Sequence, residues 1–190
     1  MATKGERTRD LILDTSYALF AQKGFKQVSM KDVCEITGMS RGGLYSHFSG
    51  TDVLFEALLE KITGESTFDI ESEIDKGTPA TAILCSALRQ MKNEIGHPES
   101  SLSVAIYEYA QMKDSKEIVK LNRRAEEKWA RLIKYGIKTG EFKDVDVEEI
   151  VNIIMYSYQG IRMWSMIIPL KTKSADKIIN HIKKQLIKEE

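Results

Sequence analysis

The chain has 190 residues, of which 42% are hydrophobic and 29% charged, and its formal net charge is zero. With only 3 prolines and 12 glycines, this composition is that of a folded globular protein and excludes a disordered or fibrous chain. The zero net charge does not require a nucleic-acid partner, although seven basic and five acidic side chains in residues 1–50 permit one.

The cysteines, the first residues and the apolar stretches of the chain indicate its cellular compartment. Cys34 and Cys85 each lie inside an apolar helical pattern, which suits reduced thiols better than a disulfide framework. The first nine residues are polar and charged, so we expect no signal peptide. The weakly charged stretch 150–170 is interrupted by polar side chains that make membrane insertion costly. We therefore expect a cytoplasmic protein without a membrane partner.

Apolar residues recur at helical rather than alternating spacing along the chain, which predicts an all-α fold. The first three helices are separated by glycine stops and serine N-caps. They are expected at about residues 8–23, 30–37 and 41–47. Only Gly38, Met39 and Ser40 separate the second helix from the third. That is the length of the connection in a helix-turn-helix.

Longer helices are predicted in the rest of the chain. A fourth begins near Thr51 with an apolar stripe on one face. Others are expected over about residues 78–95, 100–113, 115–139, 146–168 and 174–188. We therefore expect a helix-turn-helix domain over residues 1–50, followed by a larger helical domain over residues 51–190.

The third helix has an unusual composition for a structural helix. To enter a major groove about 12 Å wide, the outward residues of such a helix must be small or polar at the entering end. Arg41, Gly42, Gly43 and Ser46 meet that requirement. Two consecutive glycines in a helix cost roughly 1 kcal/mol each relative to alanine, and close approach to a DNA backbone would account for them.

The remaining residues of this helix divide between support and contact. Leu44 and Phe48 are four apart and are expected to face the core. Tyr45 and His47 lie on other faces and can each form a hydrogen bond with a phosphate. Ser40 adds backbone and hydroxyl donors at a helix N-terminus.

The segment from Gly38 to Phe48, GMSRGGLYSHF, together with its surroundings over residues 8–55, resembles the DNA-binding domain of the TetR/AcrR family of transcriptional regulators. The resemblance implies base or phosphate contacts from Arg41, Gly42, Gly43, Tyr45 and Ser46. It also implies phosphate contacts from Ser29, Lys31, Ser40 and His47. How the first group divides between bases and phosphates is left open.

One position departs from the family pattern. The family usually has lysine near the start of the fourth helix, where this chain has Thr51. A hydroxyl group and a helix N-terminus remain for a phosphate contact there, but a cation is lost. We therefore expect a shallower salt dependence of DNA binding.

In the family that the chain resembles, the second domain senses a ligand and forms a dimer. Six residues in otherwise apolar helices are candidates for binding a small-molecule effector. They are Tyr107, Glu108, Trp129, Tyr158, Arg162 and Trp164. Aromatic residues at such spacing also occur as ordinary core residues, and Glu108 and Arg162 could instead pair with each other.

The last two long helices are apolar over wide arcs, which two partners, the core and a second subunit, would explain. The predicted dimer interface comprises Val151, Ile154, Met155, Tyr158, Ile178, Ile179, Ile182 and Leu186. The alternative is a widely buried helix inside a monomer.

Together these features predict a homodimer whose recognition helices enter successive major grooves, about 34 to 36 Å apart, of a palindromic double-stranded operator. The resemblance implies a repressor that a small-molecule ligand releases from DNA. We expect no metal, no cofactor and no enzymatic activity, since no metal spacing or catalytic motif is present. The alternative is a helical sensor or carrier of small molecules that retains the helix-turn-helix as scaffold.

Overall fold

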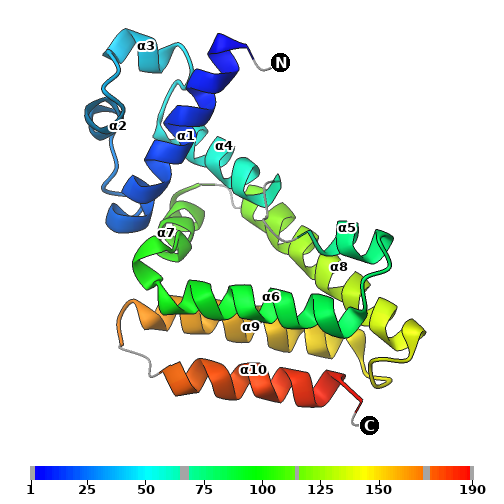
Figure 1. Ribbon diagram of the computed structural model, residues 1–190. Coiled ribbons are helices and arrows are strands. Elements are labelled where there is room, and N and C mark those ends of the chain that lie inside the picture. Colours follow the sequence, from blue (N-terminus) through cyan, green and yellow to red (C-terminus); the bar gives the residue numbers. More distant parts are fainter. Residues whose placement is uncertain (1–2, 65–68, 114–115, 169–171, 189–190) are drawn as a thin grey trace. The chain divides into compact units, whose positions relative to one another are not determined.

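The computed structural model describes residues 3–64, 69–113, 116–168 and 172–188 (Figure 1). Within these residues the regular structure is helical, apart from an antiparallel bridge between Phe142 and Ile187. The helices are α1 (Lys4–Lys23), α2 (Met30–Thr37), α3 (Arg41–Tyr45), α4 (Thr51–Gly64), α5 (Ile70–Asp75), α6 (Ala80–Gly96), the 3₁₀ turn η1 (Pro98–Ser100), α7 (Ser103–Met112), α8 (Lys116–Thr139), α9 (Val147–Ser165) and α10 (Thr172–Leu186). The predicted all-α fold is therefore confirmed.

No helix in the described part of the chain is long and apolar enough to cross a membrane.

Several helix ends differ from the predicted ones for local reasons. α1 begins at Lys4 rather than Thr8, because Thr3 and Glu6 form a capping box that satisfies the first backbone N–H groups. α7 begins at Ser103 rather than near residue 100, because η1 occupies the preceding residues. The predicted start of the following helix at Ser115 lies outside the described residues.

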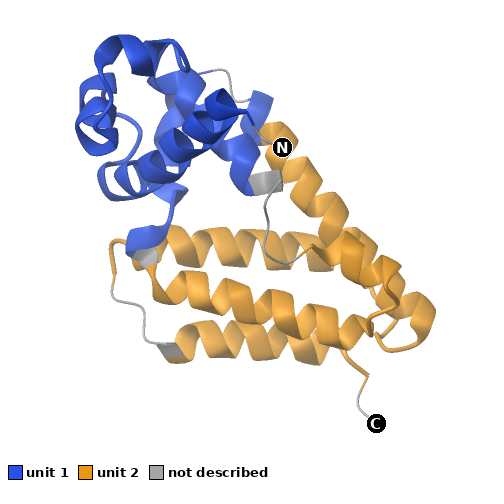
Figure 2. Cartoon of the chain, turned by 45° about the horizontal axis from the view of Figure 1, so that its top comes forward, with its two compact units in different colours: residues 1–66, 99–118 blue, residues 67–98, 119–190 orange. Residues whose placement is uncertain are grey.

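The chain folds into two compact units (Figure 2). Unit 1 combines residues 1–66 with residues 99–118, and unit 2 combines residues 67–98 with residues 119–190. Unit 1 therefore contains α1 to α4 and α7. Unit 2 contains α5, α6, α9, α10 and most of α8. The predicted boundary at residue 50 differs from this division, because α4 and α7 both pack with the helix-turn-helix.

An aromatic cluster explains why α7 belongs to unit 1. The ring centroids of Phe20 and Phe55 lie 4.8 Å apart. Tyr109 of α7 adds its ring to the same cluster, 5.0 Å from Phe25 and 5.3 Å from Phe55. Tyr109 is only 1% exposed. Because burying an aromatic side chain removes a large apolar area from water, this contact holds α7 against α1 and α4.

Unit 2 is built around α6, α9 and α10, which lie side by side (Figure 1). Their core includes Leu84 of α6, Ile154 of α9 and Leu186 of α10, each fully buried. α8 contributes Leu132 and Ile133 to the same core. Along α6 and α9 the buried positions recur at spacings of three and four residues, so one face of each of these helices is buried.

Candidate nucleic-acid interface

The start of α2 is fixed by a capping box. The Ser29 hydroxyl accepts a hydrogen bond from the Asp32 backbone N–H, and the Asp32 carboxylate accepts one from the Ser29 backbone N–H at 2.9 Å. Lys23 Nζ, at the end of α1, donates to the other Asp32 carboxylate oxygen at 2.6 Å. The hydrogen bonds from Lys23 and Ser29 hold the pKa of Asp32 well below its usual range. The capping box and ion pair therefore join the end of α1 to the start of α2.

The turn between α2 and α3 follows from two local features. Gly38 ends α2 in the left-handed conformation, with φ 68°, which favours glycine. Ser40 then caps α3, and its hydroxyl oxygen accepts a hydrogen bond from the Gly43 backbone N–H at 3.2 Å. These features set the direction of α3 relative to α2.

α3 ends at Tyr45, two residues before the predicted end at His47. The Ser46 hydroxyl donates a hydrogen bond to the Gly43 carbonyl at 2.7 Å. The His47 N–H bonds to the Leu44 carbonyl, only three residues back. The predicted α-helix is therefore corrected to a helix of five residues followed by a tighter turn.

The inner face of α3 is buried, as predicted. Leu44 is 0% and Phe48 is 1% exposed. The Arg9 guanidinium of α1 lies over the Phe48 ring, 4.3 Å from its centroid, and donates to the His47 carbonyl at 3.4 Å. α1 therefore holds α3 and its following turn in place, while the opposite face of α3 points outward.

Most of the predicted contact residues are exposed. Ser29, Lys31, Ser40, Arg41, Gly42, Tyr45 and Ser46 are exposed, whereas Gly43, His47 and Thr51 are half-buried. The Arg41 guanidinium lies 5.6 Å from the centroid of the Tyr45 ring.

Gly42 has no structural role in packing. A Cβ atom added at this position would meet no other atom within 4 Å. The exposed helix therefore has room for alanine at position 42. Glycine there leaves the backbone open to close approach by an external partner.

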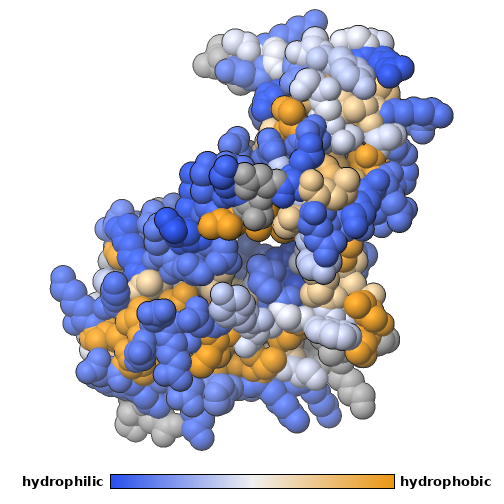
Figure 3. Space-filling view, turned by 180° about the vertical axis from the view of Figure 1, so that it is seen from behind, coloured by the Kyte–Doolittle hydropathy of each residue, from blue (hydrophilic) through white to orange (hydrophobic). Residues whose placement is uncertain are grey.

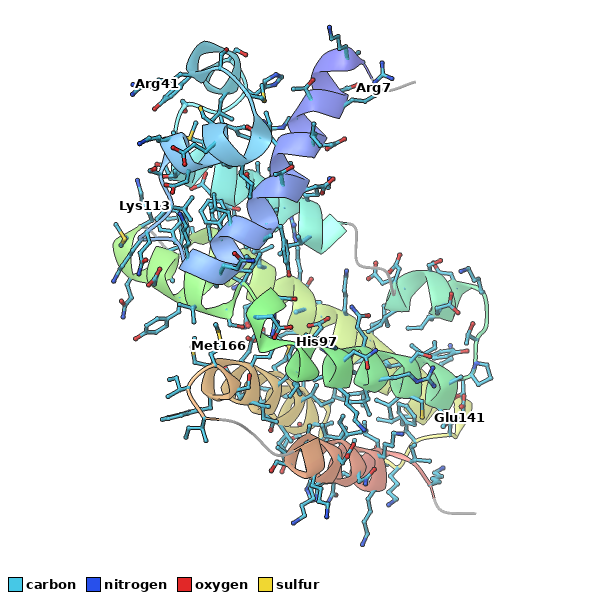
Figure 4. The ribbon with its side chains drawn as sticks, turned by 60° about the vertical axis from the view of Figure 1, so that its left-hand side comes forward. Arg7, Arg41, His97, Lys113, Glu141 and Met166 are labelled. Carbon is cyan, nitrogen blue, oxygen red and sulfur yellow. The ribbon has the colours of Figure 1, made fainter. Side chains whose placement is uncertain are left out.

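Five of the predicted residues share one groove of unit 1, with a volume of about 570 Å³. They are Ser29, Lys31, Arg41, Tyr45 and Thr51. Asp52, Met112 and Lys113 also line this groove, and Figure 4 shows Arg41 and Lys113 on the same side of unit 1. Sequence reasoning missed the two α7-side residues, because no local pattern connects positions 112 and 113 with residues 29–52.

An ion pair inside this groove links α7 to α4. Lys113 Nζ lies 2.9 Å from Asp52 Oδ2. The hydrogen bond from Lys113 holds the pKa of Asp52 below its usual value, although burial acts in the opposite direction. Both side chains remain partly exposed, at 44% for Lys113 and 37% for Asp52.

The six predicted effector residues divide between the two units. Tyr107 and Glu108 belong to α7 in unit 1, and the other four to α8 and α9 in unit 2. The Glu108 carboxylate accepts a hydrogen bond from the Lys26 backbone N–H at 2.9 Å. Tyr107 is 55% exposed. Neither α7 residue therefore lies in an enclosed apolar site within its own unit.

In unit 2 the structure brings two of the predicted effector residues together. The Arg162 guanidinium lies over the Tyr158 ring, 5.0 Å from its centroid, and 3.7 Å from the Glu94 carboxylate. Trp164 is 56% exposed and Trp129 packs partly buried against the core. A groove of about 400 Å³ between α8 and α9 includes none of the six residues.

Most residues of the predicted dimer interface are already buried inside unit 2. Six of its eight residues are at most 9% exposed in the single chain: Val151, Ile154, Met155, Ile179, Ile182 and Leu186. Ile178 also packs against this core, and Tyr158 is half-buried. Side chains that unit 2 already buries cannot bury much more surface against a second subunit. Contacts of α9 with α6 and α10 account for the burial of these residues, so a dimer interface through them stays a prediction.

Two family profiles match the chain. The profile of "Bacterial regulatory proteins, tetR family" matches residues 12–58, and that of "Tetracyclin repressor-like, C-terminal domain" matches residues 77–165. The first match includes α2, α3 and the groove residues of α4. The second covers most of unit 2.

Among the chain's relatives, the "HTH-type transcriptional repressor KstR2" of Rhodococcus jostii is 27% identical over 158 residues, covering 76% of this chain and 72% of that protein. The "uncharacterized HTH-type transcriptional regulator YfiR" of Bacillus subtilis is 29% identical over 139 residues, covering 70% and 67%.

Solved structures show the same fold. The reduced form of NemR from E. coli superposes with a TM-score of 0.82 at 15% identity, covering 96% of this chain and 100% of that one. A TetR family regulator from Cytophaga hutchinsonii gives a TM-score of 0.79 at 18% identity, covering 97% and 96%. With its helix-turn-helix, its second helical unit and the two profile matches, the chain belongs to the TetR family of DNA-binding transcriptional regulators.

Proposed function

We propose that the protein is a homodimeric repressor acting in the cytoplasm, which binds a palindromic operator through its two α3 helices and leaves it when a small-molecule effector binds. The observation that carries this proposal is the division of α3 into two faces. Leu44 and Phe48 anchor the helix, while Arg41, Gly42 and Tyr45 are exposed beside a basic groove. Such a face can supply both base and phosphate contacts.

Fluorescence anisotropy with two labelled duplexes tests DNA recognition. One duplex carries the DNA that flanks the protein's own gene, and the other a shuffled sequence of the same composition. The wild type is expected to prefer the first duplex and to lose affinity as salt rises. Arg41→Ala should cost about 1–3 kcal/mol of binding free energy if the guanidinium contacts a base.

Arg89→Ala is the matched control for charge, because Arg89 is an exposed residue of α6 outside the groove. It should bind both duplexes as the wild type does. Tyr45→Ala provides a second, independent change on the same face. Unaltered binding by both the Arg41 and Tyr45 variants would remove α3 from the proposal.

Exposed apolar residues on α9 and in the turn that follows it support dimer formation. Tyr156 of α9 is 65% exposed, and Gly160, one turn later on the same helix, has open space around its Cβ position. Ile167, in the turn after α9, is 69% exposed. On the face drawn in Figure 3, apolar side chains gather over unit 2. A two-fold dimer would bury such a surface against its own copy, and a glycine lets two helices approach closely.

Sedimentation equilibrium tests the dimer. The wild type is expected at twice the chain mass, and Tyr156→Glu is expected to shift it toward the monomer. Gln185→Glu introduces the same charge at an exposed position of α10 and should leave the dimer intact. A wild type that sediments as a monomer at the concentrations that bind DNA would contradict the proposal.

The effector proposal rests on Tyr158, Arg162 and Trp129, the predicted residues that unit 2 holds at least partly buried. A compound that binds the folded protein raises its melting temperature, so a thermal-shift screen can find candidates. Linkage then requires that a releasing compound binds DNA-bound protein more weakly than free protein. A stabilising compound that leaves DNA affinity unchanged is not an effector.

The direction of regulation is tested in cells. Deleting the gene should raise transcription from a promoter that carries the bound duplex. A fall in transcription would indicate an activator and contradict repression.

A further inference from the structure

The groove beside α3 receives a cation from a distant part of the chain. Lys113 follows α7, yet its ammonium lies at the first turn of α4, 2.9 Å from Asp52 Oδ2. α4 itself begins with the neutral Thr51. The groove therefore contains the cations Lys31, Arg41 and Lys113 against the carboxylate of Asp52. This excess of positive charge favours an anionic partner.

Lys113 retains capacity for a further contact. Its ammonium has three N–H donors, and the hydrogen bond to Asp52 uses one of them. The side chain is 44% exposed, so an external oxygen atom can reach it. It shares the groove with Ser29 and Arg41, two of the residues predicted to contact DNA.

The position of Lys113 is fixed by the helix that precedes it. Tyr109, one turn earlier, is buried in the aromatic cluster and donates a hydrogen bond to the Glu56 carboxylate. Glu108 accepts a hydrogen bond from the Lys26 backbone N–H. Together with the ion pair between Lys113 and Asp52, these two hydrogen bonds join α7 and its last residues to the rest of unit 1. The Lys113 ammonium is therefore held near the groove before any partner binds.

We propose that Lys113 is an additional DNA-contacting residue, which binds a backbone phosphate at the start of α4, and that Asp52 orients its ammonium. The proposal rests on DNA binding by α3 as proposed above. It makes the DNA-binding surface discontinuous in sequence, with one phosphate contact supplied by the segment 99–118. A phosphate contact positions the protein without reading bases, so Lys113 contributes affinity for any sequence.

The salt dependence of DNA binding distinguishes a phosphate contact from a structural ion pair. Each phosphate neutralised by a protein cation adds about 0.9 to the slope of log affinity against log salt concentration. Lys113→Gln should lower affinity for the specific and the shuffled duplex equally and reduce this slope by about one. Its loss of affinity should therefore shrink about threefold between about 50 and 200 mM salt.

Asp52→Asn separates the two roles of Lys113. It removes the ion pair but keeps the cation, so it should bind DNA as tightly as the wild type or more tightly. If Lys113 served only to hold α7 against α4, both variants would weaken DNA binding to a similar degree without changing the slope. That result would overturn the proposal.

Two further variants complete the test. Lys92→Gln in unit 2 is the matched control, because Lys92 is 41% exposed and also pairs with an aspartate, Asp176. It should retain the affinity and slope of the wild type. Lys113→Arg keeps the charge and should retain the slope even if Lys113→Gln fails to fold. A reduced slope in Lys113→Arg would count against the proposal.

The same measurements distinguish failure of DNA binding by α3 from failure of the Lys113 contact alone. If the wild type shows no salt-sensitive duplex binding, DNA binding by α3 fails together with this inference. If the wild type binds and Arg41→Ala weakens binding while Lys113→Gln matches the wild type, only the role of Lys113 is refuted.

Discussion

The Tyr109 hydroxyl donates a hydrogen bond to the Glu56 carboxylate inside the aromatic cluster of unit 1. Burial and the Glu56 carboxylate both raise the pKa of Tyr109. Its hydroxyl group is therefore protonated at neutral pH and acts as a hydrogen-bond donor. The bond connects α7 with α4, two helices that are separated in sequence by α5 and α6 of unit 2. It is one reason why unit 1 is discontinuous.

Tyr109→Phe removes only this hydroxyl. The partly buried Glu56 carboxylate then loses a partner, and hydrogen bonds to charged groups contribute about 1.5–3 kcal/mol. We expect the free energy of unfolding in urea to fall by about that amount. Tyr107→Phe is the control, because Tyr107 lies on the same helix and is 55% exposed. Equal stability of the two variants would contradict the role of this bond.

Gly136→Ala tests the packing of unit 2. The Phe142 ring lies against the Gly136 backbone, and a Cβ at position 136 would overlap it. The Phe142 N–H also donates to the Gly136 carbonyl at 2.9 Å, so the ring cannot easily move away. Overpacking of this kind costs about 1–3 kcal/mol. Gly96→Ala, whose Cβ would meet no atom within 4 Å, should show no such loss in the same urea titration.

Gly42→Ala should separate stability from DNA binding. Alanine is favoured over glycine in helices by up to about 1 kcal/mol, and the position has room for it. The variant should therefore be at least as stable as the wild type. Its affinity for the specific duplex should nevertheless fall, because the added methyl group prevents close approach to the DNA. Unchanged affinity, measured by anisotropy, would show that this glycine has no part in recognition.

Glu141 gives unit 2 a pH dependence. Pro79, the residue before α6, offers no side-chain cap, and the Glu141 carboxylate accepts hydrogen bonds from the Ala80 and Thr81 N–H groups, both at 2.9 Å. Burial opposes ionisation of Glu141, but these hydrogen bonds outweigh it and lower its pKa in the folded state. The carboxylate therefore stabilises the fold above its unfolded pKa of about 4.3, and this stabilisation is lost as pH falls through the folded pKa.

Glu141→Gln should reduce the free energy of unfolding by about 0.5–2 kcal/mol at neutral pH, the range measured for helix N-caps. The difference from the wild type should shrink as the pH falls below about 4. Glu127→Gln, at an exposed position of α8, is the control. A difference that stays constant between neutral and acidic pH would show that the carboxylate charge is not involved.

The helix-turn-helix could be predicted from sequence because its signals are local. The caps Ser29 and Ser40 act within three residues of their own positions, and Gly38 needs only its own backbone conformation. The burial of Leu44 and Phe48 followed from their spacing. The end of α3 was predicted two residues too late, at His47. The hydrogen bond from the Ser46 hydroxyl to the Gly43 carbonyl competes with a longer helix, and helical periodicity does not reveal it.

Long-range partners could not be predicted in the same way. Periodicity places a residue such as Ile154 on an apolar face but does not indicate which helix covers that face. For this reason the predicted domain boundary at residue 50 separates α7 from the unit in which it lies, and periodicity alone did not show that unit 2 itself buries most of the residues predicted at the dimer interface. Lys113 is a polar residue with no motif around it, and only the folded chain places it beside Asp52.

Footprinting on the DNA that flanks the protein's own gene tests the central claim, DNA recognition by α3, most directly. We predict two protected segments with two-fold symmetry, about one helical turn apart, that vanish when Arg41 and Tyr45 are both replaced by alanine. Protection that persists in this double variant, or no protection by the wild type at any concentration, would contradict the account.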